Sequence, residues 1–223
     1  MLSLGVVKAG AGASYHEAAV AQGAEDYYAG AGERAGRWFG RSDLLGRRAG
    51  TVADSDEAAG LLERLAHPDT GETLGRRVVE DQSVTAIDHT FSAPKSVSAI
   101  WALGDGGVRR EVEAAHDAAI AEAMGWLGSE RSRTRVRDPQ TNELRAVEHD
   151  GLVGIAYQHR TSRAGDPQLH THVVIANRVR CEGRWLTIDS RGHHDSAKAV
   201  GARYQAALRA ELETRLGVEF GEV

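Results

Sequence analysis

Three histidines in the second half of the chain have the spacing of a metal site. His170 and His172 flank Thr171 within an apolar run that is typical of a strand. Because side chains alternate along a strand, both imidazoles project from one face, with Cα atoms about 6.5–7 Å apart. His159 ends the preceding predicted strand, and antiparallel pairing would bring its ring beside the other two. Three imidazoles can hold one divalent ion and leave positions open for a substrate.

The spacing alone leaves a structural interpretation open. His159 shares its strand parity with residues that are expected to be buried, and a His-x-His pair also occurs by chance. His89 lies on one face with Ile87 and Phe91, so we expect it to be a hydrogen-bonded core residue. Five further histidines have polar neighbours, and we expect solvated or capping roles for His67, His116, His149, His193 and His194.

Asp88 is a carboxylate that could support such a site. It lies on the opposite face of its predicted strand from Ile87 and Phe91. From there it could accept the second ring N–H of a metal-bound histidine, or take a proton from a nucleophile. An exposed strand-end aspartate fits the spacing equally well.

The elements that must position these residues alternate between strands and helices. Alternation and turn residues predict strands at 2–8, 84–91, 151–159 and 169–178, and a hairpin of 131–137 with 143–149. Asp54 with Glu57 resembles a capping box, and Ser92 is the expected cap of a helix with Pro94 in its first turn. Apolar spacing predicts further helices at 15–24, 108–127 and 195–216. The pattern predicts an α+β fold, one domain over 1–223, with a largely antiparallel central sheet covered by helices.

Composition narrows the class of protein. A chain of 223 residues can bury a substantial core, and the single Cys181 excludes a disulfide framework. No segment approaches the roughly 20 apolar residues of a membrane span, and the N-terminus lacks signal-peptide features. We therefore expect a soluble, cytoplasmic protein with no membrane partner.

The charge distribution bears on a nucleic-acid partner. The formal net charge of −5 counts against one, because phosphate binding usually requires a basic surface. However, arginines occupy every second position at Arg131, Arg133, Arg135 and Arg137. On a strand they would share one face and form a local basic ridge, although a solvated edge strand protected by charge shows the same pattern.

Taken in order, the motifs resemble the conjugative relaxases of the MobF type, within the HUH endonucleases, over nearly the whole chain. The blocks that carry the resemblance are Ala13-Ser14-Tyr15, Gly23 to Tyr28, His67 to Glu72, Asp88 to Ser98, and His159 to His172. Five blocks in the family order are far more specific than any one of them. The family name refers to His-hydrophobic-His, whereas this chain has Thr171 in the middle position.

The resemblance implies an N-terminal relaxase domain with a palm-like fold that nicks one strand at a plasmid transfer origin through a 5′-phosphotyrosine. It implies Tyr15 as nucleophile, Tyr27 or Tyr28 in a second transfer, and Asp88 as the acidic partner. His159, His170 and His172 would hold one divalent ion, which could be Mn²⁺, Mg²⁺, Zn²⁺ or Ni²⁺. The implied partners are single-stranded DNA with a transfer-origin hairpin, relaxosome accessory proteins and a coupling protein.

Two departures from the family pattern matter. Tyr15 is followed by His16, where many relatives have paired tyrosines. The chain also ends at Val223, earlier than a complete relaxase domain, so we expect a C-terminal truncation relative to a longer relaxase-helicase.

Several residues are candidates for DNA contacts. Lys95 could pair with a phosphate near a helix N-terminus, and Trp38 could stack on a splayed base, although core packing is the alternative for Trp38. The candidates for tracking a phosphate backbone are Arg131, Arg133, Arg135 and Arg163.

Three other functions remain open on the residues alone. A rolling-circle replication initiator would share the tyrosine and metal chemistry but act at replication origins. A metal-dependent hydrolase would use water as the nucleophile and form no covalent adduct. A non-enzymatic DNA-binding module would use the metal only to stabilise the sheet.

Overall fold

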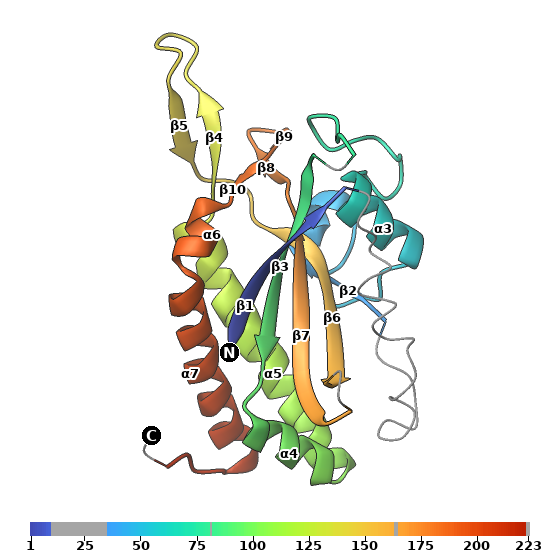
Figure 1. Ribbon diagram of the computed structural model, residues 1–223, viewed down its shortest axis with the longest axis vertical. Coiled ribbons are helices and arrows are strands. Elements are labelled where there is room, and N and C mark those ends of the chain that lie inside the picture. Colours follow the sequence, from blue (N-terminus) through green and yellow to red (C-terminus); the bar gives the residue numbers. More distant parts are fainter. Residues whose placement is uncertain (10–34, 81, 163–164, 222–223) are drawn as a thin grey trace.

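The structure is a computed structural model that describes residues 1–9, 35–80, 82–162 and 165–221. A five-stranded antiparallel sheet forms its centre (Figure 1). The strands lie in the order β1 (Leu2–Lys8), β3 (Val84–Ser92), β7 (Pro167–Ala176), β6 (Val153–Thr161) and β2 (Arg37–Gly40). The predicted α+β class with a largely antiparallel central sheet is confirmed.

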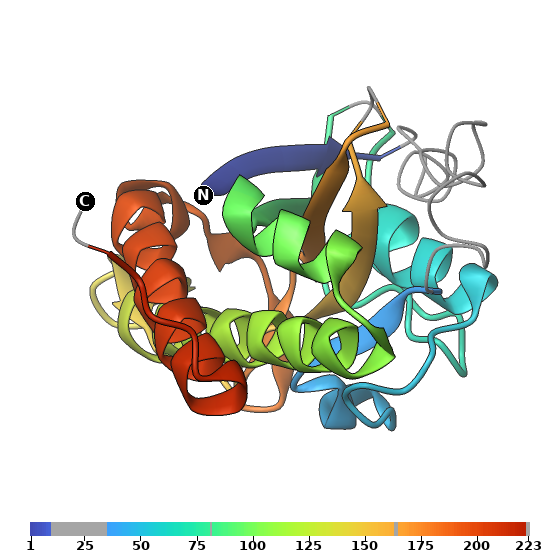
Figure 2. The ribbon, with the colours of Figure 1, turned by 90° about the horizontal axis from the view of Figure 1, so that it is seen from below.

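Helices cover the two faces of this sheet unequally. The long helices α5 (Gly106–Trp126) and α7 (Ala197–Leu216) lie together on one face, with α4 (Lys95–Leu103) at one end. The short helix α3 (Ser55–Arg64) lies on the other face, together with the 3-10 turn η1 (Ser42–Leu45) (Figure 2). Because the strands alternate, each face has its own apolar core: Ile87, Phe91 and Val173 face α5 and α7, whereas Ile155 and Val174 face α3.

A second, smaller sheet extends from one end of the molecule (Figure 1). It joins β10 (Ile188–Asp189), β4 (Arg133–Arg137) and β5 (Leu144–Val147), so the predicted arginine-containing hairpin is present. A π-helical turn, η2 (Leu127–Arg131), connects α5 to β4. The described residues also form the β8 (Val179–Cys181) and β9 (Arg184–Leu186) pair and the short helix α6 (Arg191–Asp195).

The helix starts differ in part from the predicted caps. Asp54 caps α3 by accepting the backbone N–H of Asp56, as expected. Glu57, however, does not complete a capping box, because Arg47 binds its carboxylate. The prediction that Ser92 caps the next helix was wrong: Ser92 ends β3, where its N–H donates to the carbonyl of Met1, and Pro94 is the N-cap of α4.

Among the residues that the structure describes, no helix has the length and apolar character needed to cross a membrane.

Candidate metal centre

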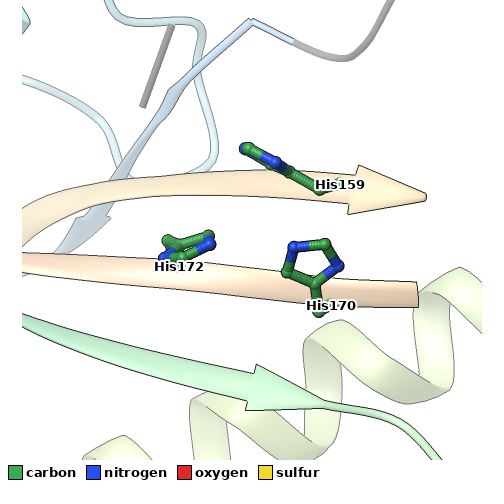
Figure 3. Close-up of side chains that lie close together, drawn as sticks. All are labelled: His159, His170 and His172. Atoms are coloured by element: carbon green, nitrogen blue, oxygen red, sulfur yellow. The ribbon is translucent and has the colours of Figure 1, made fainter. Parts of the chain in front are cut away.

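The three histidines converge on one face of the central sheet (Figure 3). In the antiparallel β6–β7 ladder, His159 stands directly opposite His170, and Tyr157 stands opposite His172. One ring nitrogen of each histidine lies within 4.8 Å of those of the other two. At this spacing the three nitrogens could hold one metal ion. Among the described residues, these form the cluster of potential metal ligands, and it lies on the face that carries α3.

Hydrogen bonds set the tautomers of two of these rings. Nδ1 of His170 donates to the carbonyl of Gln168 at 2.9 Å, and Nδ1 of His172 donates to Oδ2 of Asp88 at 2.8 Å. A neutral imidazole that donates through Nδ1 carries its lone pair on Nε2. Both rings are therefore held in the tautomer that presents Nε2 as a metal ligand.

Asp88 thus has the contact that the first of its two expected roles requires, as the partner of a candidate ligand. Thr90, which sequence reasoning missed, adds to this contact: its hydroxyl lies 3.1 Å from Nδ1 of His172 and 3.3 Å from Oδ1 of Asp88. The signal was present, because Thr90 has the same strand parity as Asp88.

Burial lowers the pKa of one histidine in the cluster. The removal of His170 from solvent lowers the pKa of its imidazole below the usual 6.5, and the neighbouring His172 acts in the same direction. His159 is only 5% exposed. A neutral ring is the form that binds a cation, so a lowered pKa keeps His170 competent as a ligand at neutral pH.

The donor set can be tested against the expected ion. Three neutral nitrogen donors suit zinc, copper, nickel and manganese, while magnesium prefers oxygen ligands. The side-by-side rings, the fixed tautomers and the lowered pKa all fit a divalent transition-metal ion bound through His159, His170 and His172.

Comparison with known proteins places this geometry in a family. The model of the TrwC relaxase family matches residues 9–223. The chain belongs to the TrwC relaxase family. It is 36% identical over 231 residues to the multifunctional conjugation protein TraI of Escherichia coli, and 34% identical over 206 residues to TraI of Escherichia coli strain K12. These alignments span only 12% and 11% of the TraI chains.

Solved structures of TrwC relaxases share the fold. A copper-bound complex of the conjugative relaxase TrwC with oriT DNA is 33% identical, with a TM-score of 0.78, over 98% of this chain and 72% of that one. TrwC with a 27-mer DNA comprising the recognition hairpin and the cleavage site is 30% identical, with a TM-score of 0.74, over 100% and 72% of the two chains.

The tyrosines and one arginine that the relaxase resemblance selected, Tyr15, Tyr27, Tyr28 and Arg163, lie outside the described residues. Lys95 is exposed as the first residue of α4, and its Nζ lies 3.4 Å from the carbonyl of Pro167 near the start of β7. It remains a candidate for a phosphate contact at that end of the sheet.

The interpretation of Trp38 as a base-stacking residue is wrong. Its side chain is 2% exposed and packs in the α3-side core against Ile155. Trp38 faces the core because β2 pairs with β6 and places it opposite that residue. The alternative given for it, core packing, is the one observed.

The arginine ridge is shorter than predicted. Arg131 is the last residue of the π-helical turn η2, and its guanidinium lies over the ring of Trp126, so it does not continue the strand. Arg133 and Arg135 are on β4, on the face opposite the buried Thr134. Arg133 donates to the carbonyls of Ser129 and Ser132, and Arg135 pairs with Asp189 at 3.2 Å.

Two histidines assigned to solvated positions are in fact buried. His116 is fully buried on α5, and His193 is 1% exposed in α6. The signal for His116 was its place four residues from both Val112 and Ile120, which puts it on the apolar face of the helix. The short α6 offers too little periodicity to have located His193.

A groove of about 740 Å³ lies elsewhere, between β2 and α5 on the opposite face of the sheet from the metal centre. Its walls include Phe39, Ile120 and Leu152, and none of the three clustered histidines lines it. The groove is therefore separate from the histidine cluster.

Proposed function

We propose that this domain cleaves one DNA strand at a transfer origin and holds the cleaved end covalently. The observation that carries the proposal is the convergence of His159, His170 and His172, with Asp88 fixing the tautomer of His172, in a chain of the TrwC relaxase family. The oriT DNA in the TrwC complexes supports transfer-origin DNA as the substrate.

In this proposal Tyr15 is the nucleophile. Its phenolic oxygen bonds to phosphorus and its proton passes to solvent, while the bond from phosphorus to the 3′ oxygen breaks and that oxygen gains a proton. The products are a 5′-phosphotyrosine and a free 3′-hydroxyl. Since a phosphodiester is retained, a 3′-hydroxyl can attack it and rejoin the strand. Tyr27 or Tyr28 would accept a second strand in the same way.

The chain's own residues prepare the reaction centre. His159, His170 and His172 would hold the ion, and Asp88 keeps the ring of His172 oriented. A divalent ion bound there supplies positive charge that polarises the scissile phosphate. The donor set favours Mn²⁺, Zn²⁺ or Ni²⁺ over Mg²⁺ within the range expected from the sequence, and the copper in one TrwC complex supports a transition metal.

The exposed hairpin would bind the DNA. Arg133 and Arg135 on β4, together with Lys95 on α4 and Arg163, supply the positive charge for phosphate contacts. We further propose that relaxosome accessory proteins and a coupling protein assemble with this domain in the cytoplasm, within a longer protein.

The test is a search for a covalent adduct. The protein is incubated with Mn²⁺ and single-stranded oligonucleotides from candidate transfer origins, and a denaturant-resistant protein–DNA species is sought by gel and mapped by mass spectrometry. We expect an adduct on Tyr15 that disappears when the metal is chelated and in the Tyr15→Phe variant. An adduct of normal yield in Tyr15→Phe would show that the nucleophile is misassigned.

The same assay separates the other functions. Nicked DNA without an adduct would indicate a water-using hydrolase, and adducts formed only on replication-origin hairpins would indicate a replication initiator. Tight DNA binding without cleavage on any origin would favour the non-enzymatic binding module.

A further inference from the structure

Helix α5 carries three polar side chains toward the face of the sheet that lies behind the metal centre. Glu113, His116 and Asp117 are spaced i, i+3 and i+4, so they share one side of the helix. Glu113 and His116 are polar but are buried among the apolar residues of this helix. Buried polar groups are costly unless they are hydrogen-bonded, so their partners indicate what they do.

His116 joins the central strand to a second helix. Its Nε2 lies 2.9 Å from the hydroxyl of Thr171 on β7, and its Nδ1 lies 2.8 Å from the hydroxyl of Tyr204 on α7. Thr171 is 3% exposed and Tyr204 is fully buried. Thr171 stands between His170 and His172, at the position that the relaxase resemblance expects to be hydrophobic. The Thr171 hydroxyl and the His116 ring therefore serve as hydrogen-bond partners for each other in the core.

The neighbours of His159 have the same relation to α5. Arg160 follows His159, and its guanidinium contacts the carboxylate of Glu113 at 3.2 Å, which also accepts the indole N–H of Trp101 at 3.0 Å. Gln158 precedes His159, and its amide donates to Asp117 at 3.4 Å. Each of the three α5 side chains thus contacts a residue adjacent in sequence to a histidine of the cluster.

We propose that Glu113, His116 and Thr171 are positioning residues for the metal centre, with the contact between His116 and Thr171 as the principal member. This inference rests on the proposed metal site. The group acts from the reverse face of the sheet, and none of its members belongs to the histidine cluster.

The alternation of the strand explains the action. The side chain of Thr171 and the rings of His170 and His172 project from opposite faces of the same three residues. A directional hydrogen bond at Thr171 fixes the height and rotation of this segment relative to α5. Apolar contacts alone would permit small shifts, and such shifts displace both rings together. The Glu113–Arg160 contact restrains the facing strand beside His159 in the same way.

The test compares two buried threonines. Thr171→Val removes the hydroxyl at nearly constant volume and leaves His116 without that partner. Thr134→Val is the matched control: Thr134 is also buried, it lies in the separate three-stranded sheet, and its hydroxyl donates to the carbonyl of Thr187 at 2.8 Å. Both variants remove one buried hydrogen bond, so both should lower the melting temperature. Thr171→Ser keeps the hydroxyl and serves as the rescue.

The primary readout is metal binding by the protein without DNA, with Co²⁺ absorption spectra for ligand geometry and calorimetric titration with Zn²⁺ for affinity. We expect Thr171→Val to weaken Zn²⁺ binding about tenfold and to alter the Co²⁺ spectrum, as loss of a supporting group around metal ligands does. Thr171→Ser and Thr134→Val should keep the wild-type affinity and spectrum.

A Thr171→Val variant with wild-type affinity and spectrum, but a melting temperature lowered as in Thr134→Val, would overturn the proposal and leave only a packing role. Equal weakening in both variants would overturn it as well. If the wild-type protein binds neither Co²⁺ nor Zn²⁺, the proposed metal site itself fails, which is a distinct result. Recovery of wild-type affinity in Thr171→Val combined with His116→Phe would also overturn the proposal, because apolar contacts alone would then be enough to position the segment.

Discussion

The central sheet and the β4–β5 hairpin use polar residues in opposite ways. In the sheet and the helix α5 behind it, polar side chains are buried or partly buried and paired with one another, as in the contacts of His172 with Asp88 and of His116 with Thr171. In the hairpin, Arg135 and Arg137 are exposed, and every described residue of β5 is at least partly exposed. Burial fixes orientation, whereas exposure leaves charge available to a partner. We propose that the reaction centre lies on the sheet and that the hairpin binds phosphates.

The largest expected effect is a loss of stability in acid. It should arise in the central sheet and the helices packed on it and not in the hairpin. Burial lowers the pKa of His89 to about 4 and those of His116 and His193 to about 3, from an ordinary 6.5. Below pH 6.5 these histidines therefore bind protons in the unfolded chain but not in the folded chain. The free energy of unfolding is highest above pH 6.5 and decreases as the pH drops toward 4. At pH 5 the decrease is at most about 2 kcal/mol per histidine.

This prediction is checked by urea unfolding of the metal-free protein at pH 7.5, 6 and 5. His193→Gln serves as the comparison, because it does not titrate but can still hydrogen-bond to Ser132 and His89, the present partners of His193. The variant should lose less stability between pH 7.5 and 5 than the wild type. Equal acid sensitivity in both proteins would rule out His193 as a source of the effect.

The sequence predicted much of the metal centre because that site depends on local rules. Strand alternation placed His170 and His172 on one face, and a short connection made antiparallel pairing with the strand of His159 the natural choice. Asp88 could be assigned to the correct face for the same reason. The contact with His172 required the structure, since only the packing of β3 against β7 shows that Asp88 reaches this ring.

Other features depend on long-range packing and could not be predicted in this way. Trp38 was ambiguous because the partner of a four-residue strand is not encoded locally. Arg131 fits the alternation of a strand, but a π-helical turn at the end of α5 includes it. The contact of His116 with Thr171 joins residues 55 positions apart, and neither residue indicates the other by its local pattern.

The second prediction tests whether the sheet orients the ligands. Asp88→Asn keeps the shape of the side chain but removes the negative charge that faces Nδ1 of His172. We expect Zn²⁺ affinity to fall about 10-fold to 100-fold, as for other carboxylates that support metal-bound histidines. The measurement is calorimetric titration of the protein without DNA.

Asp138→Asn is the matched control in the hairpin. Asp138 accepts the backbone N–H groups of Gln140 and Thr141 in the turn between β4 and β5, which belong to the second sheet and not to the sheet that carries the histidines. The same chemical change there should leave Zn²⁺ affinity unaltered. Comparable losses in both variants would show that the metal centre is sensitive to general loosening rather than to the charge of Asp88.

The smallest expected effect concerns the hairpin, and it should appear in DNA binding alone. Combined Arg133→Gln and Arg135→Gln removes two positive charges from β4. We expect affinity for a transfer-origin hairpin to fall about tenfold at moderate salt, and the slope of log affinity against log salt to decrease by about 1 for each phosphate that the variant no longer binds. Metal affinity should not change.

Combined Arg209→Gln and Arg215→Gln, on the C-terminal half of α7 at the opposite end of the molecule, makes the same change in net charge (Figure 1). If that control weakens DNA binding equally, net charge determines the affinity. The proposal that the hairpin binds the DNA would then be wrong.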